Sequence, residues 1–154
     1  MKSKAPLVLM EQMVMLLVFA LAAALCLQAF VKSDEISLKS QAKSNAAMAA
    51  QNVAELLRHN GGSYDHALRE TAGKMSGSYV EGDGGAEGRL EIFYDREWKA
   101  VKEGDYLLTA EGVLSPEQGL QRVRVQVADL ASASGDKEVL FELEATWLEV
   151  ETDE

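Results

Sequence analysis

Residues 5–31 read APLVLMEQMVMLLVFALAAALCLQAFV, and residues 13–27 within this stretch form an unbroken apolar run of 15 residues. Only Glu11, Gln12 and Gln28 interrupt the apolar character of the whole stretch. As a helix, its 27 residues would extend about 40 Å, which exceeds the roughly 30 Å hydrocarbon core of a bilayer. The stretch is therefore long enough to cross a membrane.

The charges of the chain lie almost entirely outside this stretch. The 154 residues include 15 Lys and Arg against 25 Asp and Glu, a net charge of −10. Residues 1–31 hold only Lys2, Lys4 and Glu11, which leaves 13 basic and 24 acidic side chains on the other 123 residues. The length allows one domain with an anchor. The acidic balance argues against a nucleic-acid partner, because phosphate binding needs clustered Lys and Arg.

The apolar stretch admits three interpretations. Met-Lys-Ser-Lys at the start and Ala22-Ala23-Ala24 as an exit match a cleaved secretory signal, which would release a secreted domain. The apolar character continues past Ala24 without a helix breaker, which favours an uncleaved anchor with a cytoplasmic N-terminus and an extracytoplasmic C-terminal domain. In the third interpretation Glu11 has a function, because a carboxylate in an apolar span usually has a partner.

A helical pattern continues beyond the apolar stretch. No Pro or Gly occurs between Pro6 and Gly61, and the apolar positions of one face recur at spacings of four, three, four and three residues. Those positions are Ala42, Ala46, Ala49, Val53 and Leu56. The sequence His59-Asn60-Gly61-Gly62 is typical of a helix end. The pattern predicts a single helix of roughly 50 residues.

These features resemble those of type IV pilin-like proteins of the pseudopilin or minor-pilin kind. The resemblance covers about residues 1–58 and rests on the basic start, on VLMEQMVMLLVFALAAALCLQAF with its early Glu, and on the amphipathic extension. In that family a peptidase cuts just before the apolar segment, and a Glu five residues into the mature chain contacts the neighbouring subunit's N-terminal amine. By position Glu11 matches that Glu, Leu7 would be the first mature residue, and Pro6 stands where the family has Gly or occasionally Ala.

Two different segments are expected between the long helix and the sheet. Ser63–Met75 is predicted to form a short helix with Ala67, Leu68 and Ala72 facing inward. Residues 77–88, GSYVEGDGGAEG, are predicted to be a flexible loop. The loop acids Glu81, Asp83 and Glu87 suggest calcium, but their spacing does not match an EF-hand, so we expect a solvated acidic loop and no metal site.

From Arg89 onward the apolar residues alternate with a period of two, which predicts an antiparallel meander. The predicted strands are Leu90–Tyr94, Trp98–Val101, Tyr106–Leu108, Leu120–Ala131 and Glu138–Val150. The last two should form a hairpin around a turn at Ser132–Lys137. Its predicted cross-strand pairs are Val123–Leu143, Val125–Phe141 and Val127–Val139 on the buried face, with Arg124–Glu142 and Arg122–Glu144 on the exposed face.

Together these patterns predict an α+β fold. The membrane-spanning half of the long N-terminal helix is followed by an amphipathic half, which packs on a small antiparallel β-sheet head. The predicted segments are an anchor helix at 1–31, its amphipathic extension at 32–60, a variable helix and Gly-rich loop at 61–88, the sheet at 89–150 and an acidic tail at 151–154.

The motifs indicate a structural protein rather than an enzyme. His59 and His66 have no metal-ligand partner at a recognisable spacing, and GDGGAEG lacks the Lys and the Ser or Thr of a phosphate-binding loop. Trp98 and Trp147 are expected in the core. We expect no cofactor.

The resemblance implies a single-pass subunit of the bacterial cell membrane, in a type IV pilus, competence or type II secretion-like filament. Its expected partners are other pilin-like subunits, the filament assembly platform and the membrane. The alternative is an anchored extracytoplasmic binding or adaptor domain without a filament role.

Overall fold

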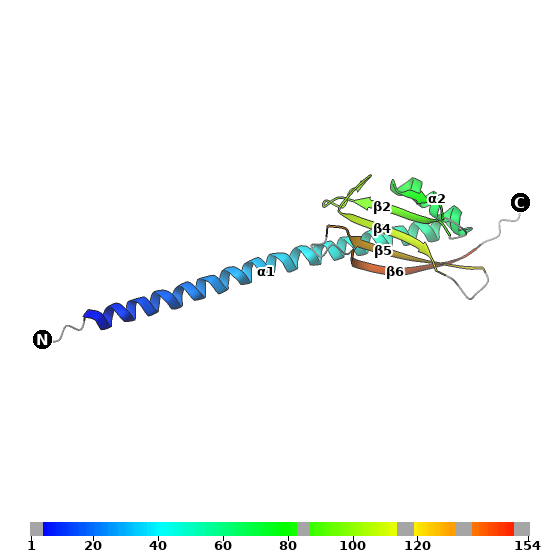
Figure 1. Cartoon of the computed structure of the whole chain (residues 1–154). Coiled ribbons are helices and arrows are strands. Elements are labelled where there is room, and N and C mark those ends of the chain that lie inside the picture. Colours follow the sequence, from blue (N-terminus) through cyan, green and yellow to red (C-terminus); the bar gives the residue numbers. More distant parts are fainter. Residues whose placement is uncertain (1–4, 83–86, 114–118, 132–136, 150–154) are drawn as a thin grey trace, which may run out of the picture. The chain divides into compact units, whose positions relative to one another are not determined.

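The computed structural model describes residues 5–82, 87–113, 119–131 and 137–149, with the backbone alone at residues 5–7 (Figure 1). Its helices are α1 (Ala5–Asn60) and α2 (Tyr64–Met75). Its strands are β1 (Ser78–Val80), β2 (Arg89–Tyr94), β3 (Ala100–Val101), β4 (Tyr106–Gly112), β5 (Leu120–Asp129) and β6 (Glu138–Leu148). A long N-terminal helix thus packs on an antiparallel sheet, which confirms the predicted α+β fold. Asp83, most of the predicted turn at 132–137 and the acidic tail at 151–154 lie outside the described residues.

Helix α1 runs without a break from Ala5 to Asn60, which confirms the predicted single helix. Pro6 lies in its first turn, where the missing N–H of proline is tolerated. The helix ends at Asn60, and the next residue, Gly61, adopts a φ of 54° and donates its N–H to the carbonyl oxygen of Leu57 at 3.1 Å. This left-handed residue directly after the helix is the arrangement that Gly favours at helix ends.

The chain forms two compact units, Met1–Gln41 and Ala42–Glu154. The first contains the N-terminal part of α1. The second, which we name the C-terminal unit, contains the rest of α1, helix α2 and the sheet. The core lies in the C-terminal unit.

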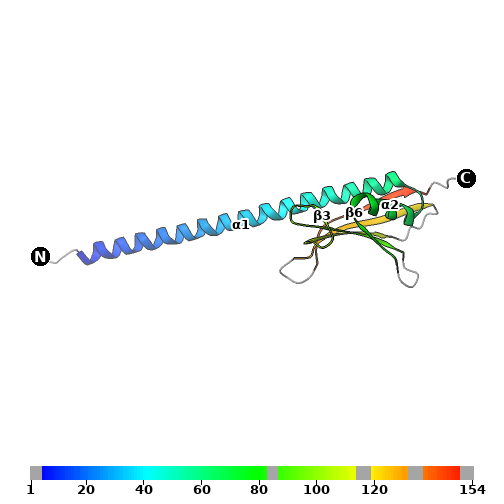
Figure 2. The ribbon, with the colours of Figure 1, turned by 90° about the horizontal axis from the view of Figure 1, so that it is seen from above.

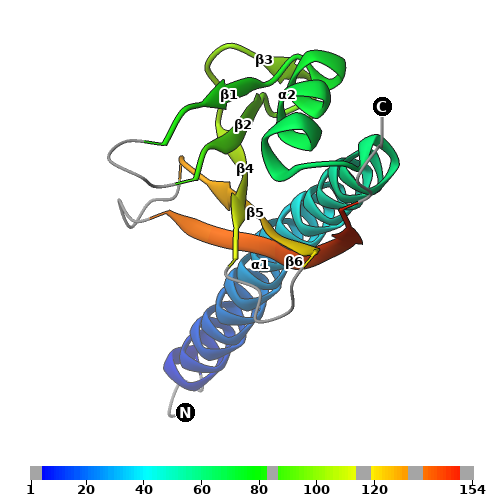
Figure 3. The same ribbon diagram turned by 90° about the vertical axis from the view of Figure 1, so that its right-hand side faces the viewer.

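The described strands form one six-stranded sheet in the order β1-β2-β4-β5-β6, with β3 also pairing with β2 (Figure 3). All of the paired strands are antiparallel. Because β2, β4, β5 and β6 pair in chain order except for the short β3, the predicted meander is confirmed. Strand β6, with 11 residues, lies at one edge of the sheet.

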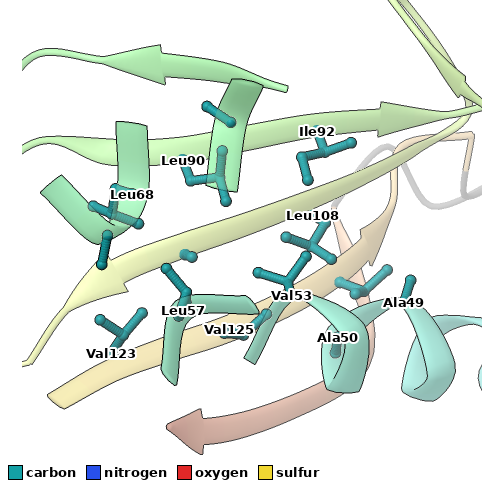
Figure 4. Packing of buried hydrophobic residues seen from close by; sticks show 14 of the residues in the cluster. Ala49, Ala50, Val53, Leu57, Leu68, Leu90, Ile92, Leu108, Val123 and Val125 are labelled. Carbon is teal, nitrogen blue, oxygen red and sulfur yellow. The ribbon is translucent and has the colours of Figure 1, made fainter. Parts of the chain in front are cut away.

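One face of the sheet is covered by α1 and α2 (Figure 2). The close view in Figure 4 shows side chains of α1, α2, β2, β4 and β5 meeting in this layer. Among the fully buried members are Val53, Leu57, Leu68, Leu90, Leu108, Val123 and Val125. Helix α2 confirms the predicted short helix, since Ala67, Leu68 and Ala72 are all buried.

The buried face of α1 differs from the predicted face by a small rotation. Ala46, Ala49 and Val53 are buried as predicted, but Leu56 is partly exposed and Leu57 is fully buried instead. The fully buried positions are Ala46, Ala50, Val53 and Leu57. Both Leu56 and Leu57 follow Val53 at helical spacing, so the sequence pattern allowed either. Leu57 belongs to the core cluster with residues of α2 and the sheet, so packing against these elements determines which of the two leucines is buried.

The predicted register of the β5–β6 hairpin is wrong by two residues. Val125 lies opposite Leu143, Arg124 opposite Glu144, and Val127 opposite Phe141. A shift of two residues keeps every side chain on its face, so the alternation could not distinguish the two registers. In addition, a β-bulge between Val127 and Ala128 inserts Leu140, which is buried, and places Val139 on the exposed face, where it is 46% exposed.

The prediction of a flexible loop at residues 77–88 is wrong for β1, which pairs with β2 through Ser78–Glu91, Tyr79–Leu90 and Val80–Arg89. Glycines permit close packing here. A Cβ atom on Gly77 would lie 2.7 Å from Cγ1 of Ile92, and one on Gly88 would overlap the Tyr79 ring. At Gly77 and Gly88, glycine is therefore needed because the backbone lies close to neighbouring side chains.

Candidate functional site

The N-terminal part of α1 presents a continuous apolar surface. Every described side chain from Val8 to Gln41 is exposed, and the large apolar ones between Val8 and Val31 are 56% to 74% exposed. They include Leu16, Leu17, Phe19, Leu25 and Phe30. Monomeric soluble proteins rarely expose apolar patches of more than a few hundred Å². This surface therefore requires a covering medium or partner.

Helix α1 is long and apolar enough to cross a membrane, and it is the one described helix with these properties. A helix satisfies its backbone hydrogen bonds within itself, so it can lie in hydrocarbon without unpaired polar groups. Helix α1 therefore has the exposed apolar surface and the length that a membrane anchor needs.

Glu11 lies on this apolar surface with its side chain exposed. Within the described part of the chain, no cation pairs with its carboxylate. Pro6 and Leu7, the candidate processing residues, lie in the first turn of α1, where only the backbone is described. The roles inferred for Glu11, Pro6 and Leu7 therefore stay predictions.

A second candidate site is an open groove of about 570 Å³ beside the start of α2. Four acidic residues line it: Asp65, Glu81, Glu87 and Glu149. Arg69 supplies a positive charge, pairing with Glu81 at 3.0 Å and lying 4.2 Å from the centre of the Tyr79 ring. The groove brings together residues from α2, β1 and the ends of the sheet, which no local sequence pattern could identify.

The hydroxyl groups of two tyrosines form hydrogen bonds between segments at this groove. The buried Tyr64 hydroxyl donates to the carbonyl oxygen of Gly88 at 2.5 Å and accepts the N–H of Gly112 at 2.7 Å. Burial raises the pKa of Tyr64 well above its usual range. The Tyr79 hydroxyl donates to Asp65 at 2.5 Å, and this hydrogen bond is the main cause of its raised pKa. Both hydroxyls therefore stay protonated at neutral pH and serve as structural donors.

The acidic side chains of the groove are partly engaged by a cation. Glu81, one of the acids considered for calcium, is engaged by Arg69. Among the residues that the structure describes, no three His, Cys, Asp or Glu side chains gather as metal ligands. The arrangement suits recognition of a cationic or polar group by charge and hydrogen bonds.

An aromatic cluster occupies the opposite end of β2. Trp98 stacks on Tyr106 with ring centroids 4.5 Å apart, and its centroid lies 5.8 Å from that of Tyr94. The predicted strand Trp98–Val101 is shorter in the structure, because Trp98 adopts a φ of 60° in a turn closed by Asp95. A bulky residue rarely adopts this conformation. Trp98 is partly exposed, whereas Trp147 is buried as predicted.

The Tyr94 hydroxyl in this cluster is buried and has no hydrogen-bond partner among the described residues. Burial raises its pKa. An unpaired buried hydroxyl destabilises the folded state by about 1 to 3 kcal/mol. We therefore expect Tyr94→Phe to raise the free energy of unfolding by about 1 kcal/mol, measured by urea denaturation of the full chain in detergent micelles.

Tyr64→Phe is the matched control, because the Tyr64 hydroxyl has two backbone partners. Its loss leaves Gly112 N–H and Gly88 carbonyl without their partner, so we expect stability to fall by about 1 to 3 kcal/mol. If both variants destabilised the protein equally, the Tyr94 hydroxyl would have a partner after all.

Comparison of the chain with protein-family models, with curated proteins and with solved structures gave no match.

Proposed function

We propose that this protein is a membrane-anchored, pilin-like structural subunit of a type IV pilus, competence or type II secretion-like filament. The observation that carries the proposal is the continuity of α1. Its first part is wholly exposed and apolar, and its last part, without a break, covers an antiparallel sheet. One helix thus joins a surface suited to lipid or other helices to a folded unit suited to water.

Assembly in this proposal depends on packing. The apolar parts of neighbouring helices lie side by side, first in the membrane and then in the filament. Glu11 pairs with the positive N-terminal amine of a neighbouring subunit. A carboxylate in an apolar span is unfavourable by a few kcal/mol without a partner, so pairing favours the assembled state.

The proposed topology places the short Lys-bearing N-terminus in the bacterial cytoplasm and the acidic C-terminal unit outside the cell membrane. Short cytoplasmic segments carry the excess of Lys and Arg in membrane proteins, and Lys2 and Lys4 fit this rule. The proposed partners are other pilin-like subunits and the assembly platform.

Disulfide trapping on the apolar surface tests this function. In a Cys26→Ser background, Leu16→Cys or Leu17→Cys should, under a mild oxidant in the native membrane, give disulfide-linked dimers with another copy of this chain or with a pilin-like subunit that carries a cysteine at the matching position. A strictly monomeric pattern at both positions would remove the filament proposal.

Glu11→Ala is expected to reduce the crosslinked yield about tenfold or more, which corresponds to at least 1.4 kcal/mol of assembly free energy. Membrane insertion should be unchanged, because the substitution makes the helix more apolar. Gln12→Ala is the matched control at the adjacent position and should leave the yield unaltered. An unchanged yield in Glu11→Ala would contradict the role of the carboxylate.

The groove beside α2 favours a second candidate function, an anchored extracytoplasmic binding or adaptor domain. In that case Glu11→Ala has no effect, while changes in the groove acids abolish binding of a partner. Mass spectrometry of the mature N-terminus adds an independent test. A chain beginning at Leu7 supports processing as in pilins, one beginning at Met1 indicates a plain anchor, and one beginning at Leu25 indicates a secreted domain.

A further inference from the structure

Strand β6 forms a long edge of the sheet. Among the described strands it pairs with β5 alone, whereas the strand at the other edge, β1, has three residues (Figure 3). From Phe141 to Leu148 its register with β5 is regular, and this stretch, FELEATWL, contains no Pro or Lys. Native proteins protect edge strands with Pro, Lys and other charges, with bulges or with short length. In this stretch only the charges of Glu142 and Glu144 provide such protection.

The hydrogen bonds between β5 and β6 show which backbone groups of β6 point to the edge. Glu149 donates its N–H to the carbonyl oxygen of Gly119 at 2.8 Å. In an antiparallel pair, hydrogen-bonded and non-hydrogen-bonded residue pairs alternate along the strands. In the register of β5 with β6, Glu142, Glu144 and Thr146 therefore direct their N–H and carbonyl groups away from β5. In the described part of the chain, no backbone hydrogen bond from outside the sheet reaches these groups.

The side chains along this edge differ between the two faces of the sheet. Phe141 and Leu143 lie on the face that the helices cover, where they pack against the core but stay partly exposed. Glu142 and Glu144 lie on the other face and are 45% and 44% exposed. The guanidinium group of Arg124 lies 3.4 Å from both carboxylates, so one positive charge is shared by two negative charges. The edge thus offers uncovered apolar area on one face and excess negative charge on the other.

We propose that this edge of β6 binds an extended segment of another protein as an additional strand. In such an addition the main-chain hydrogen bonds provide affinity, and the alternating side chains provide specificity. The segment that fits has apolar residues at alternate positions, which cover Phe141 and Leu143. Between them it has Lys or Arg, which lie beside Glu142 and Glu144, because opposite charges on neighbouring strands stabilise the pairing.

A second copy of this chain fits the edge poorly. The C-terminal unit has 22 acidic and 11 basic residues, and pairing of two β6 edges would bring two such units together. Like charges directly opposite each other on neighbouring strands are destabilising. Glu142 and Glu144 therefore disfavour self-association through the same charge that attracts a basic segment. All of these features belong to the C-terminal unit, so the docking surface is independent of the filament role.

Titration of the full chain in phosphatidylcholine nanodiscs with a peptide of four Lys-Val repeats tests the proposal. Hydrogen exchange of the Glu142, Glu144 and Thr146 amides, followed by NMR, should slow about tenfold or more when the peptide is bound. No protection of these amides by the peptide would overturn the proposal. Protection that instead appears in the chain alone, as its concentration is raised, would assign the edge to a second copy and also overturn it.

Two control peptides separate strand addition from general attraction to an acidic protein. A peptide of four Glu-Val repeats has the wrong charge, and a block of four Lys followed by four Val has the right charge without the alternation. Both should bind about tenfold or more weakly than the Lys-Val peptide, because neither satisfies both faces of the edge. Equal binding of the block peptide would contradict an added strand.

Thr146→Pro tests the backbone contribution. The substitution removes an outward N–H and places the proline ring where the added strand would lie, and proline is tolerated at such positions of edge strands. We expect Lys-Val binding to weaken about tenfold or more while the urea transition of the C-terminal unit stays unchanged. Ala145→Pro is the matched control, because Ala145 bonds to β5 opposite Val123, and it should abolish the transition. Equal loss of the transition in both variants would show that the Thr146 N–H does not point outward.

The double variant Glu142→Lys and Glu144→Lys tests the charge contribution. It should reverse the preference, so that the Glu-Val peptide binds about tenfold more tightly than the Lys-Val peptide. The same change of charge in the groove beside α2, Glu81→Lys with Glu87→Lys, is the matched control and should keep the preference for Lys-Val. A preference that persists in the β6 variant and is lost in the groove variant would locate the peptide in the groove and overturn the proposal.

Discussion

Leu57→Ala is expected to lower the free energy of unfolding of the C-terminal unit by about 2 to 5 kcal/mol. Leu57 is fully buried in the last turn of α1 and belongs to the core cluster shared by both helices and the sheet. Removing three carbon atoms there loses their transfer free energy and leaves a cavity that the surrounding strands can only partly fill. Urea denaturation followed by Trp fluorescence measures this, since Trp98 and Trp147 both lie in the C-terminal unit.

Leu56→Ala is the matched control for this variant. Leu56 has the same chemistry and the neighbouring position in the helix, but its side chain is partly exposed. We expect a loss of about 1 kcal/mol, because less apolar area returns to water and no enclosed cavity forms. A larger effect for Leu56 than for Leu57 would mean that α1 is rotated toward the face predicted from the sequence.

Gly104→Ala is expected to destabilise the C-terminal unit by about 3 kcal/mol. Gly104 lies between β3 and β4, and a Cβ atom there would overlap the backbone carbonyl group of Tyr94 and approach Val101. A backbone group fixed in the sheet cannot move aside as a flexible side chain can, so the turn must shift. The substitution should therefore lower the free energy of unfolding, and urea denaturation of the full chain in micelles measures this change.

Gly73→Ala should have the opposite effect. Gly73 lies inside α2, is exposed, and a Cβ atom there would meet nothing within 4 Å. Replacing an unhindered Gly in a helix by Ala stabilises it by about 0.5 to 1 kcal/mol. If Gly104→Ala were as well tolerated as Gly73→Ala, the close approach of the turn to Tyr94 would be wrong.

The candidate sites differ in how far the sequence could predict them. The apolar surface of α1 is contiguous in the chain, so residues 5–31 define it without any knowledge of tertiary structure. The groove beside α2 draws Tyr64, Tyr79, Gln121 and Glu149 from distant parts of the chain. Residues separated by so many positions meet only through strand pairing, and no periodicity within one element could have indicated them.

The β5–β6 hairpin marks the limit of pattern reasoning. The alternation determined which residues of β5 face the core, and Val123, Val125 and Val127 are indeed fully buried. Charge pairing did not fix the register, because Arg124 lies within 3.4 Å of both Glu142, the predicted partner, and Glu144, the actual one. A long Arg side chain reaches diagonal as well as direct neighbours, so opposite charges are compatible with both registers.

The sequence by itself determined the long helix, with its apolar and amphipathic parts, and the antiparallel sheet, because helix breakers, hydrophobic periodicity and charge act between residues near in the chain. Only the tertiary structure decided between Leu56 and Leu57, between two hairpin registers, and between loop and strand at Ser78–Val80. In the first two cases the local patterns were equally well satisfied by both alternatives, and at Ser78–Val80 the glycine content favoured the loop. The choice was made by side-chain volume and close backbone approach between elements distant in sequence, which a local pattern does not contain.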